Sequence, residues 1–288
     1  MKSLAGLAEI ADRYEGYILD LWGLIHDGET PYAPAAATLK ALKAAGKKTL
    51  LLSNAPRRAQ PLIDGLDRMG IGRDLYGDVL SSGEATRSAL IERRDPFFAA
   101  LGRRAYHLGP ERDRSVFEGT DLDVVGRIED AQMIVNTGPI DLDQSVIDWE
   151  PLLVAGAARA LPMICANPDH VVIRGGRRIV CAGAIAARYG ALGGSVAYRG
   201  KPDPAIYHDS LLRLGLSDAA RVVVVGDALD TDVKGAASAG LDSLWCTGGI
   251  HAEELGTRYG ELASPERAQS LAARYGQSPT ATIPGFVW

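Results

Sequence analysis

The sequence has no concentrated block of basic residues and no net positive charge. Lys and Arg together number 31 against 36 Asp and Glu, which leaves a formal net charge of −5. Proteins that bind nucleic acids usually concentrate Lys and Arg on one face or in one stretch. The charge pattern therefore argues against nucleic acid as a partner, although a few local groups are enough to bind a small anionic substrate.

Cysteine is also scarce, and long apolar runs are absent. Cys165, Cys181 and Cys246 are far apart in the sequence, so neither a disulfide framework nor a zinc site is expected. No apolar run reaches the roughly 18–20 residues that a membrane-spanning helix needs. Residues 1–12 lack the apolar stretch of a signal peptide. These absences predict a cytoplasmic protein with no membrane partner.

Aromatic residues make up only 6% of the 288 residues, whereas hydrophobic residues of all kinds make up 47%. A chain of this length has room for two domains. Short apolar runs bounded by polar residues or glycine predict strands that are buried on both faces, as in parallel sheets. We expect strands at 17–22, 48–53, 133–136, 163–166, 221–226 and 243–246.

Helical stretches alternate with these strands. Residues 35–45, 61–69 and 232–239 each end just before a glycine, a common helix stop. Alternating strands and helices predict an α/β fold with right-handed crossovers. The middle of the chain has strand and helix candidates of its own, which predicts a domain at 83–194 inserted into a domain made of 1–82 and 195–288. Within it, the charged and glycine-rich residues 111–121 are expected to form a surface loop.

Polar residues follow several of the predicted strands at their carboxyl ends, where parallel sheets bind ligands. Asp20 ends the first strand, Ser53 and Asn54 end the second, and Asp227 follows the strand at 221–226. A carboxylate in this place can attack an electrophile or hold a divalent cation. A hydroxyl beside the amides of a helix start can hold a phosphate oxygen. Taken singly, these residues are better explained as caps of helices and turns.

Two further segments point to the same chemistry. Lys201 lies on a turn with two prolines before a predicted helix at 205–214, which suits a fixed positive charge beside a phosphate. Asp227, Asp230 and Asp232 place three carboxylates within six residues, and these repel one another unless a cation binds or they reach solvent. Such oxygen ligands suit Mg²⁺. Together and in this order, the segments favour one active site over several unrelated caps.

The order of these motifs resembles that of the haloacid dehalogenase (HAD) superfamily, which has a nucleophilic Asp, a Ser or Thr, a Lys and an acidic cluster. The chain is most similar to the class IIA, NagD-like branch. The segments that carry this similarity are 27–28, 53–54, 81–85, 167–169, 183–187, 200–202, 226–227 and 231–232. The resemblance implies an α/β fold with a Rossmann-like parallel-sheet core and an α/β cap domain inserted between the second and third motifs.

The resemblance also implies a phosphatase of small phosphorylated metabolites, such as a sugar phosphate or a nucleotide-like compound. Asp20 would form an aspartyl phosphate that water then hydrolyses. Ser53 and Lys201 would hold the phosphoryl oxygens, and Asn54 would position the nucleophile loop or the substrate. The implied Mg²⁺ ligands are Asp20, the backbone carbonyl of Trp22 and Asp227, with Asp232 supporting the metal shell.

The cap would choose the substrate. Asn167 and Asp169, in a loop stiffened by Pro168, are the best candidates to face it, although Asn-Pro and Pro-Asp are also common in ordinary turns. Class IIA relatives often pair through the cap, so the resemblance also implies a homodimer formed by this domain.

The first motif departs from the family at Trp22. The family has a general acid/base Asp two residues after the nucleophile, and losing such a group typically costs about 10²–10⁴-fold in rate. His26 or Asp27 in the following turn would be a substitute, although both also fit packing or turn roles. Alternatively, the substrate has a good leaving group, such as an acyl phosphate. Trp22 itself either packs at the strand end or shapes the substrate pocket.

Three functions follow from these residues. A Mg²⁺-dependent phosphatase is favoured, because the other chemical groups are all present. A phosphometabolite-binding or regulatory protein on a degenerate HAD scaffold would explain Trp22. A dehalogenase also uses a strand-end Asp, but carbon–halogen substitution needs no Mg²⁺, so the acidic cluster argues against it.

Overall fold

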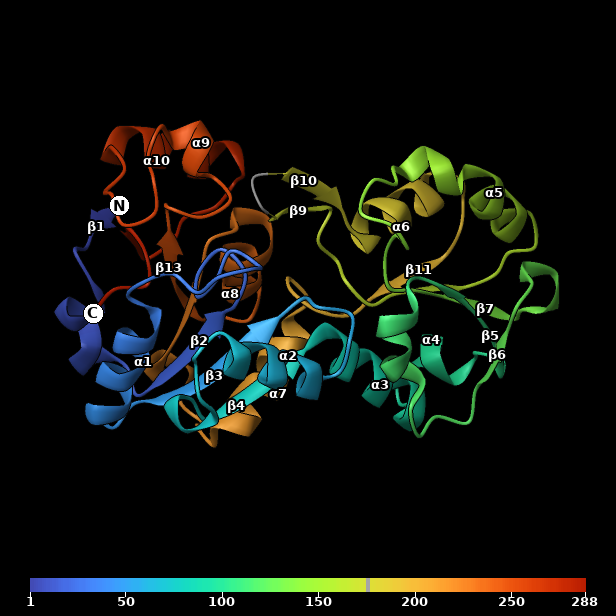
Figure 1. Cartoon of the computed structure of the whole chain (residues 1–288), viewed down its shortest axis with the longest axis horizontal. Helices are drawn as coiled ribbons and strands as arrows, with labels where there is room; N and C mark the ends of the chain where they lie inside the picture. The colour runs from blue at the N-terminus through green and yellow to red at the C-terminus, as the bar shows by residue number, and fades with distance from the viewer. Residues whose placement is uncertain (175–176) are drawn as a thin grey trace.

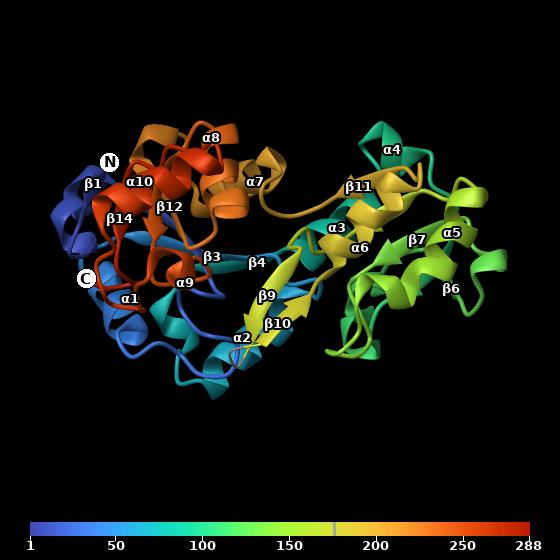
Figure 2. The same cartoon turned by 90° about the horizontal axis from the view of Figure 1, so that it is seen from above.

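The protein folds into two α/β units that lie side by side, a larger core and a smaller cap (Figure 1). The computed structural model describes residues 1–174 and 177–288. Both chain ends lie in the core, and the cap is formed by the middle of the chain (Figures 1 and 2). The predicted fold class, a parallel-sheet core with an inserted α/β cap, is confirmed.

The core is built on a parallel sheet in the order β1-β14-β13-β12-β2-β3-β4. Its strands are β1 (Lys2–Ser3), β2 (Gly16–Asp20), β3 (Lys48–Ser53), β4 (Asp78–Ser81), β12 (Val222–Gly226), β13 (Asp242–Cys246) and β14 (Ala281–Ile283). β2 lies between β12 and β3. The carboxyl ends of these three neighbouring strands therefore meet at one edge of the sheet.

Helices cover both faces of the core sheet. Tyr17 and Leu19 of β2 pack in the same cluster as residues of α1 (Ala35–Ala44) and α2 (Ala59–Arg68). Ile18, between them, packs instead with residues of α7 (Pro204–Leu214) and α8 (Lys234–Ser238). Because both sets of side chains are buried, β2 reads in sequence as a continuous apolar run rather than an alternating one.

The cap repeats this layered arrangement around a parallel sheet in the order β11-β8-β7-β5-β6. Its strands are β5 (Arg104–Leu108), β6 (Asp123–Val125), β7 (Met133–Asn136), β8 (Met163–Cys165) and β11 (Val196–Tyr198). One face packs against α5 (Glu150–Ala158) and α6 (Ala182–Ala191), and the other against α3 (Ser82–Glu92) and α4 (Pro96–Ala99). The domain division at 82/83 and 194/195 stays a prediction, and β11 belongs to the cap sheet beyond its second boundary.

A β-hairpin extends from the cap toward the core. It consists of β9 (Val171–Arg174) and β10 (Arg177–Val180), which pair antiparallel. Residues 175–176, between these two strands, lie outside the described residues. In both views the hairpin reaches from the cap sheet toward the core (Figures 1 and 2), so it is well placed to contact the carboxyl edge of the core sheet.

One local prediction was wrong, and one predicted helix is confirmed but begins earlier than expected. Residues 111–121 are not simply a surface loop, because they form the 3₁₀ helix η3 (Glu111–Phe117), in which Asp113 and Val116 are buried. Val116 packs in the cap core, and Asp113 lies 3.5 Å from Arg57 Nε of the core domain. The helix predicted at 232–239 begins earlier, with a π-helical turn, η7 (Leu229–Val233), before α8.

The remaining short elements are 3₁₀ turns and small helices. They are η1 (Leu7–Arg13), η2 (Arg73–Leu75), η4 (Ile128–Asp130), η5 (Val146–Trp149), η6 (Ala219–Arg221), α9 (Ala252–Leu255) and α10 (Pro265–Arg274).

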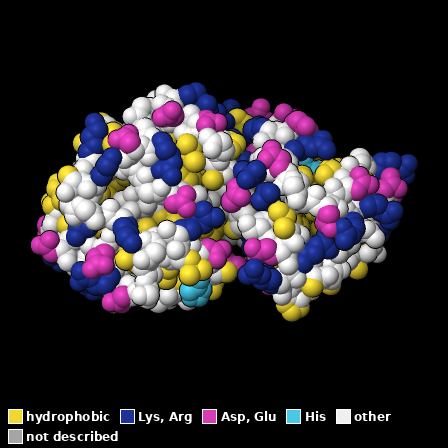
Figure 3. Space-filling model, turned by 90° about the horizontal axis from the view of Figure 1, so that it is seen from below, with side chains coloured by type: hydrophobic (Ala, Val, Ile, Leu, Met, Phe, Trp, Pro, Cys, Tyr) yellow, Lys and Arg dark blue, Asp and Glu magenta, His cyan; other side chains and the backbone are white. Residues whose placement is uncertain are grey.

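The cysteines and the helices can be described directly in the structure. Cys165, Cys181 and Cys246 are buried and free. Within residues 1–174 and 177–288, no helix combines the length and apolar character needed to cross a membrane. Acidic and basic side chains both occur across the face drawn in Figure 3.

Candidate active site

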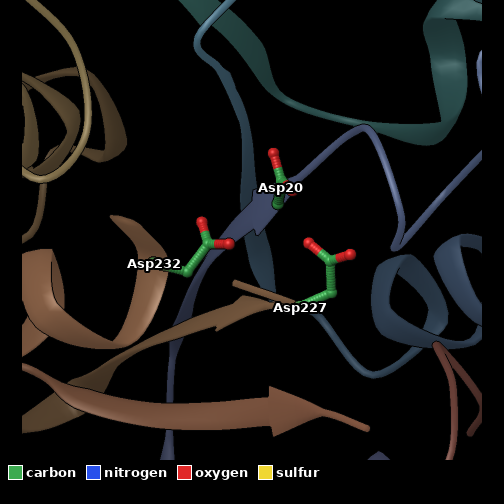
Figure 4. A group of neighbouring side chains, drawn as sticks. All are labelled: Asp20, Asp227 and Asp232. Atoms are coloured by element: carbon green, nitrogen blue, oxygen red, sulfur yellow. The ribbon is translucent and has the colours of Figure 1, made fainter. Parts of the chain in front are cut away.

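A buried cluster of three aspartates and one lysine lies at the carboxyl edge of the core sheet, and Figure 4 shows its three carboxyl groups. Asp20 is the last residue of β2, Asp227 follows β12, and Asp232 lies in η7. Lys201 Nζ donates hydrogen bonds to Asp20 Oδ1 at 2.6 Å and to Asp232 Oδ1 at 2.7 Å. The structure thus brings together four residues that the sequence separates by up to 212 positions (232 − 20).

Close backbone packing holds Asp227 in place. Ile250 N donates to Asp227 Oδ2 at 2.6 Å. A Cβ atom at Gly23 would lie 1.9 Å from this oxygen, and one at Gly249 would lie 2.2 Å from it. Gly23 also has φ = +82°, a backbone conformation that residues other than glycine rarely adopt. The two glycines therefore let the main chain approach the carboxylate from two sides.

Asp232 is engaged through both of its carboxylate oxygens. Oδ1 accepts from Lys201, and Oδ2 accepts from Ala228 N at 3.1 Å. Among the described residues, no hydrogen bond reaches the second oxygen of Asp20 or of Asp227. This difference fits Asp20 and Asp227 as direct metal ligands and Asp232 as a residue that supports them.

The electrostatics of the cluster favour a bound cation. Burial raises the pKa of Asp20 to about 7, although Lys201 opposes this shift, and burial also raises the pKa of Asp227 well above its usual value. Burial would lower the pKa of Lys201, but Asp20 and Asp232 outweigh it and raise that pKa. Ligand oxygens of the three aspartates lie within 4.8 Å of one another. One lysine against three carboxylates leaves negative charge that a divalent, oxygen-preferring ion such as Mg²⁺ would balance.

Ser53 is the last residue of β3 and Asn54 follows it, so both lie across Asp20 from Asp227. Ser53 is 8% exposed, and its Oγ accepts from Ala55 N at 3.2 Å. Asn54 holds the main chain of Lys201 by two hydrogen bonds, in which Oδ1 accepts from Lys201 N at 2.7 Å and Nδ2 donates to Lys201 O at 3.0 Å. The predicted role of Asn54 concerned the nucleophile loop or the substrate, whereas its contacts in this structure position the lysine.

The cap contributes the loop that contains Asn167 and Asp169. Asn167 Oδ1 accepts from Asp169 N at 3.1 Å, so this side chain shapes the turn itself. Asp169 reaches the core, where its Oδ1 accepts from Asn54 Nδ2 at 2.8 Å. Burial raises the pKa of Asp169 to about 6, although Lys201 and the hydrogen bond from Asn54 oppose the shift. The turn interpretation therefore fits Asn167, while Asp169 lies at the active-site edge.

Trp22 joins the loop after β2 to the cap hairpin. Its Nε1 donates to Ile173 O of β9 at 2.7 Å. The indole packs edge-to-face on His26 with ring centroids 5.5 Å apart, and a Cβ atom at Gly28 would lie 2.1 Å from it. Nearby, Arg174 Nε lies 3.6 Å from Glu29 Oε1. Trp22 thus packs against its own turn and binds the backbone of the cap hairpin.

His26 and Asp27 are engaged within their own turn. Asp27 Oδ1 accepts from Glu29 N at 2.9 Å and Thr30 N at 2.7 Å. His26 Nδ1 accepts from Gly28 N at 3.0 Å, and burial lowers the pKa of His26 to about 4. In the described part of the chain, no hydrogen bond joins either residue to Asp20 or Lys201. Their contacts favour the structural interpretation over a proton-transfer role.

The chain is similar in sequence and in fold to proteins of a known family. A profile described as haloacid dehalogenase-like hydrolase matches residues 17–123, and a HAD-hydrolase-like profile matches residues 198–273. The crystal structure of a hydrolase of the haloacid dehalogenase-like family from Brucella suis is 36% identical in sequence. Its TM-score is 0.84, and the match covers 99% of this chain and 100% of that one.

Two relatives have named activities. The D-glycerol 3-phosphate phosphatase of Mycobacterium tuberculosis is 28% identical over 246 residues, which is 85% of this chain and 66% of the relative. This chain therefore spans just under two thirds of that relative's length. The acid sugar phosphatase of Staphylococcus aureus is 26% identical over 242 residues, covering 83% of this chain and 88% of the relative.

Proposed function

Because the chain belongs to the haloacid dehalogenase-like hydrolases, in their class IIA branch, we propose that it is a Mg²⁺-dependent phosphatase of small phosphorylated metabolites. The observation that carries the proposal is the contact of 2.6 Å between Lys201 Nζ and Asp20 Oδ1, beside the buried carboxylate of Asp227. A strand-end nucleophile, a fixed positive charge and a cation site together suit phosphoryl transfer.

In the proposed reaction, a carboxylate oxygen of Asp20 attacks phosphorus and the bond to the leaving oxygen breaks. The resulting aspartyl phosphate is then hydrolysed by water. Lys201 Nζ and Ser53 Oγ hold the phosphoryl oxygens and stabilise the charge that develops on them. Asp20, Asp227 and the backbone carbonyl of Trp22 would bind Mg²⁺, which when bound neutralises phosphoryl charge.

The substrate is proposed to be a small alkyl phosphate, such as a polyol or sugar phosphate. The two named relatives act on glycerol 3-phosphate and on sugar phosphates. The cap is seated on the core through Asn54–Asp169 and Trp22–Ile173. Cap loops this near the site restrict the leaving group to a small one, with the loop at 167–169 facing it.

The second candidate is a phosphometabolite-binding protein. Trp22 favours it, because the indole N–H is occupied by Ile173 O and position 22 offers no carboxyl group. Such a protein would be stabilised by its ligand without converting it. Turnover is therefore the property that separates the two candidates.

The test of the proposed function is phosphate release from a panel of compounds, with Mg²⁺ and with EDTA. The panel contains glycerol 3-phosphate, several sugar phosphates, a nucleoside monophosphate and acetyl phosphate. We expect release from at least one alkyl phosphate, and a loss on the order of 10²-fold or more in EDTA, because the aspartate cluster then lacks its cation. Thermal stabilisation by these compounds without any release would favour the binding protein instead. Release that persists in EDTA would contradict the Mg²⁺ requirement.

We also propose that the chain forms a homodimer through the cap. Large apolar side chains are exposed between residues 140 and 154, namely Ile140 (49%), Leu142 (39%), Ile147 (80%) and Val154 (48%). Light scattering is expected to give about twice the chain mass of 30.5 kDa, and Ile147→Asp to give monomers, since burying a charge is costly. Leu212→Asp, at an equally exposed site on the core, is the control. A monomeric wild-type protein would contradict this proposal.

A further inference from the structure

Hydrolysis of an alkyl phosphate needs a proton donor that the core cluster does not supply. The leaving oxygen departs as an alcohol only if it gains a proton, and a positioned acid is worth about 10²–10⁴-fold in rate. Asp232 is occupied through both oxygens, and Asp20 and Asp227 have the roles of nucleophile and metal ligand. Among the described residues, two further carboxyl groups lie near this edge: Asp230 of η7, which is exposed to solvent, and Asp169 of the cap, which is partly buried. The inference drawn from it rests on the proposed function.

Asp169 is held rigidly from both sides. Its main-chain N–H is bound by Asn167, and its Oδ1 accepts from Asn54 Nδ2 at 2.8 Å. Asn54 also binds the main chain of Lys201, whose Nζ contacts the nucleophile. A single amide side chain therefore connects Asp169 with the lysine that lies against Asp20.

The second carboxyl oxygen of Asp169 is available for chemistry. No hydrogen bond to Asp169 Oδ2 is found in residues 1–174 and 177–288. The residue lies two positions before β9, where the chain leaves the cap sheet for the hairpin that reaches the core (Figure 2). Asp169 thus approaches from the cap, the side that would face the leaving group, whereas the nucleophile comes from the core sheet.

Other groups near the site are less suited to the role. The indole N–H of Trp22 donates to Ile173 O and does not ionise in water. Asp27 is engaged by backbone N–H groups of its turn, and the pKa of His26 is lowered to about 4 by burial. The carboxyl group of Asp169, by contrast, has a pKa raised to about 6 by burial, which suits a group that gives and regains a proton near neutral pH.

We propose that Asp169 is the general acid and base of this enzyme, supplied by the cap in place of a carboxyl group at position 22. As the Asp20 oxygen bonds to phosphorus, the bond from phosphorus to the leaving oxygen breaks, and its electron pair takes the Asp169 proton. The products are the alcohol, the aspartyl phosphate and the Asp169 carboxylate. That carboxylate then takes a proton from the water that attacks phosphorus. The bond to Asp20 breaks, inorganic phosphate leaves, and Asp169 is protonated again.

The test compares leaving groups in Asp169→Asn, which keeps an acceptor for Asn54 but has no acidic proton. The substrates are the alkyl phosphate that wild type hydrolyses fastest and acetyl phosphate, whose leaving group needs no acid. We expect kcat/KM for the alkyl phosphate to fall on the order of 10²-fold. For acetyl phosphate, kcat/KM of the variant should stay within about threefold of the wild-type value. The reason is that kcat/KM covers only the steps up to phosphorylation of Asp20, and these need no acid for this leaving group. The kcat for acetyl phosphate should nevertheless fall, since water attack then lacks its base.

Two controls separate this role from a structural one. Asp143→Asn makes the same change at an exposed cap residue, which pairs with Arg177 at 2.6 Å. In this variant kcat/KM should stay unchanged for both substrates. Asp169→Ala also removes the contact to Asn54, so it should lower kcat/KM for both substrates. Thermal unfolding of each variant monitors folding.

The outcomes distinguish this inference from the proposed function. Equal losses of kcat/KM for both substrates in Asp169→Asn, or no loss for the alkyl phosphate, would overturn the role of Asp169 while leaving the phosphatase intact. A wild-type protein that hydrolyses neither substrate would contradict the proposed function, and this inference with it.

Discussion

Replacing Asp20 with Asn is expected to abolish phosphate release, with a loss on the order of 10⁴–10⁶-fold in kcat, the scale seen when a nucleophile is removed. The amide cannot form the aspartyl phosphate, and it also removes the negative charge from one of the proposed ligands of the cation. Asp20 lies at the end of β2 and contacts Lys201 at 2.6 Å, so the isosteric change leaves the local packing in place. Phosphate release and trapping of labelled phosphoenzyme from acetyl phosphate are the measurements.

The same variant should not be less stable in the absence of divalent cations. In wild type, the carboxylates of Asp20, Asp227 and Asp232 surround a single lysine, and burying like charges together is unfavourable. We expect the melting temperature in EDTA to equal or exceed that of wild type, and the rise in melting temperature caused by Mg²⁺ to shrink. Asp12→Asn, at an exposed position shortly before β2, should change neither property. Retained turnover in a clean Asp20→Asn preparation, and in Asp20→Ala, would disprove the nucleophile assignment.

Replacing Lys201 with Met is expected to lower both activity and stability. Lys201 is 3% exposed and contacts Asp20 and Asp232 at 2.6 and 2.7 Å. Removing one partner of a buried ion pair costs about 3–5 kcal/mol, because the charges that remain are unpaired. Losing a fixed charge that stabilises the transition state costs about 10²–10³-fold in kcat. Urea unfolding and phosphate release would measure the two effects.

Mg²⁺ should restore part of the stability lost in Lys201→Met, since a bound cation also neutralises the aspartates, but it should not restore turnover. Lys43→Met is the matched control, because Lys43 pairs with Asp74 at the surface, where an ion pair contributes about 0–1 kcal/mol. An unchanged free energy of unfolding in Lys201→Met would mean that the buried charges are compensated by other groups.

Much of the fold could be predicted because local patterns of apolar and polar residues indicate where its strands and helices form. The runs at 48–53 and 221–226 are apolar throughout because both faces of the sheet are covered by helices, and they form β3 and β12. Parallel neighbours bring their carboxyl ends to one edge, so Asp20, Ser53 and Asp227 could be placed near one another before any distance was known. The short 3₁₀ helix at Glu111–Phe117 was not predicted, because a charged, glycine-rich segment is typical of an exposed loop, whereas Asp113 is buried beside Arg57.

The cap contacts could not be read from the sequence in the same way. Asn54 and Asp169 are 115 positions apart, and Trp22 and Ile173 are 151 apart. Asn-Pro-Asp is compatible with an ordinary turn, and Asn167 does form one. Nothing in these segments specifies which of their polar atoms face the core.

By itself, the sequence determined the layered α/β architecture, because hydrophobic patterning and strand-end polarity are local properties of the chain, and the order of its motifs indicated the family. Only the tertiary structure decided that His26 and Asp27 serve their own turn, that Asn54 holds the main chain of Lys201, and that Asp169 reaches the active-site edge. The physical reason is that a hydrogen bond acts over a short distance, since its donor and acceptor must lie within about 3 Å of each other. Whether two distant segments approach that closely depends on how the cap packs against the core.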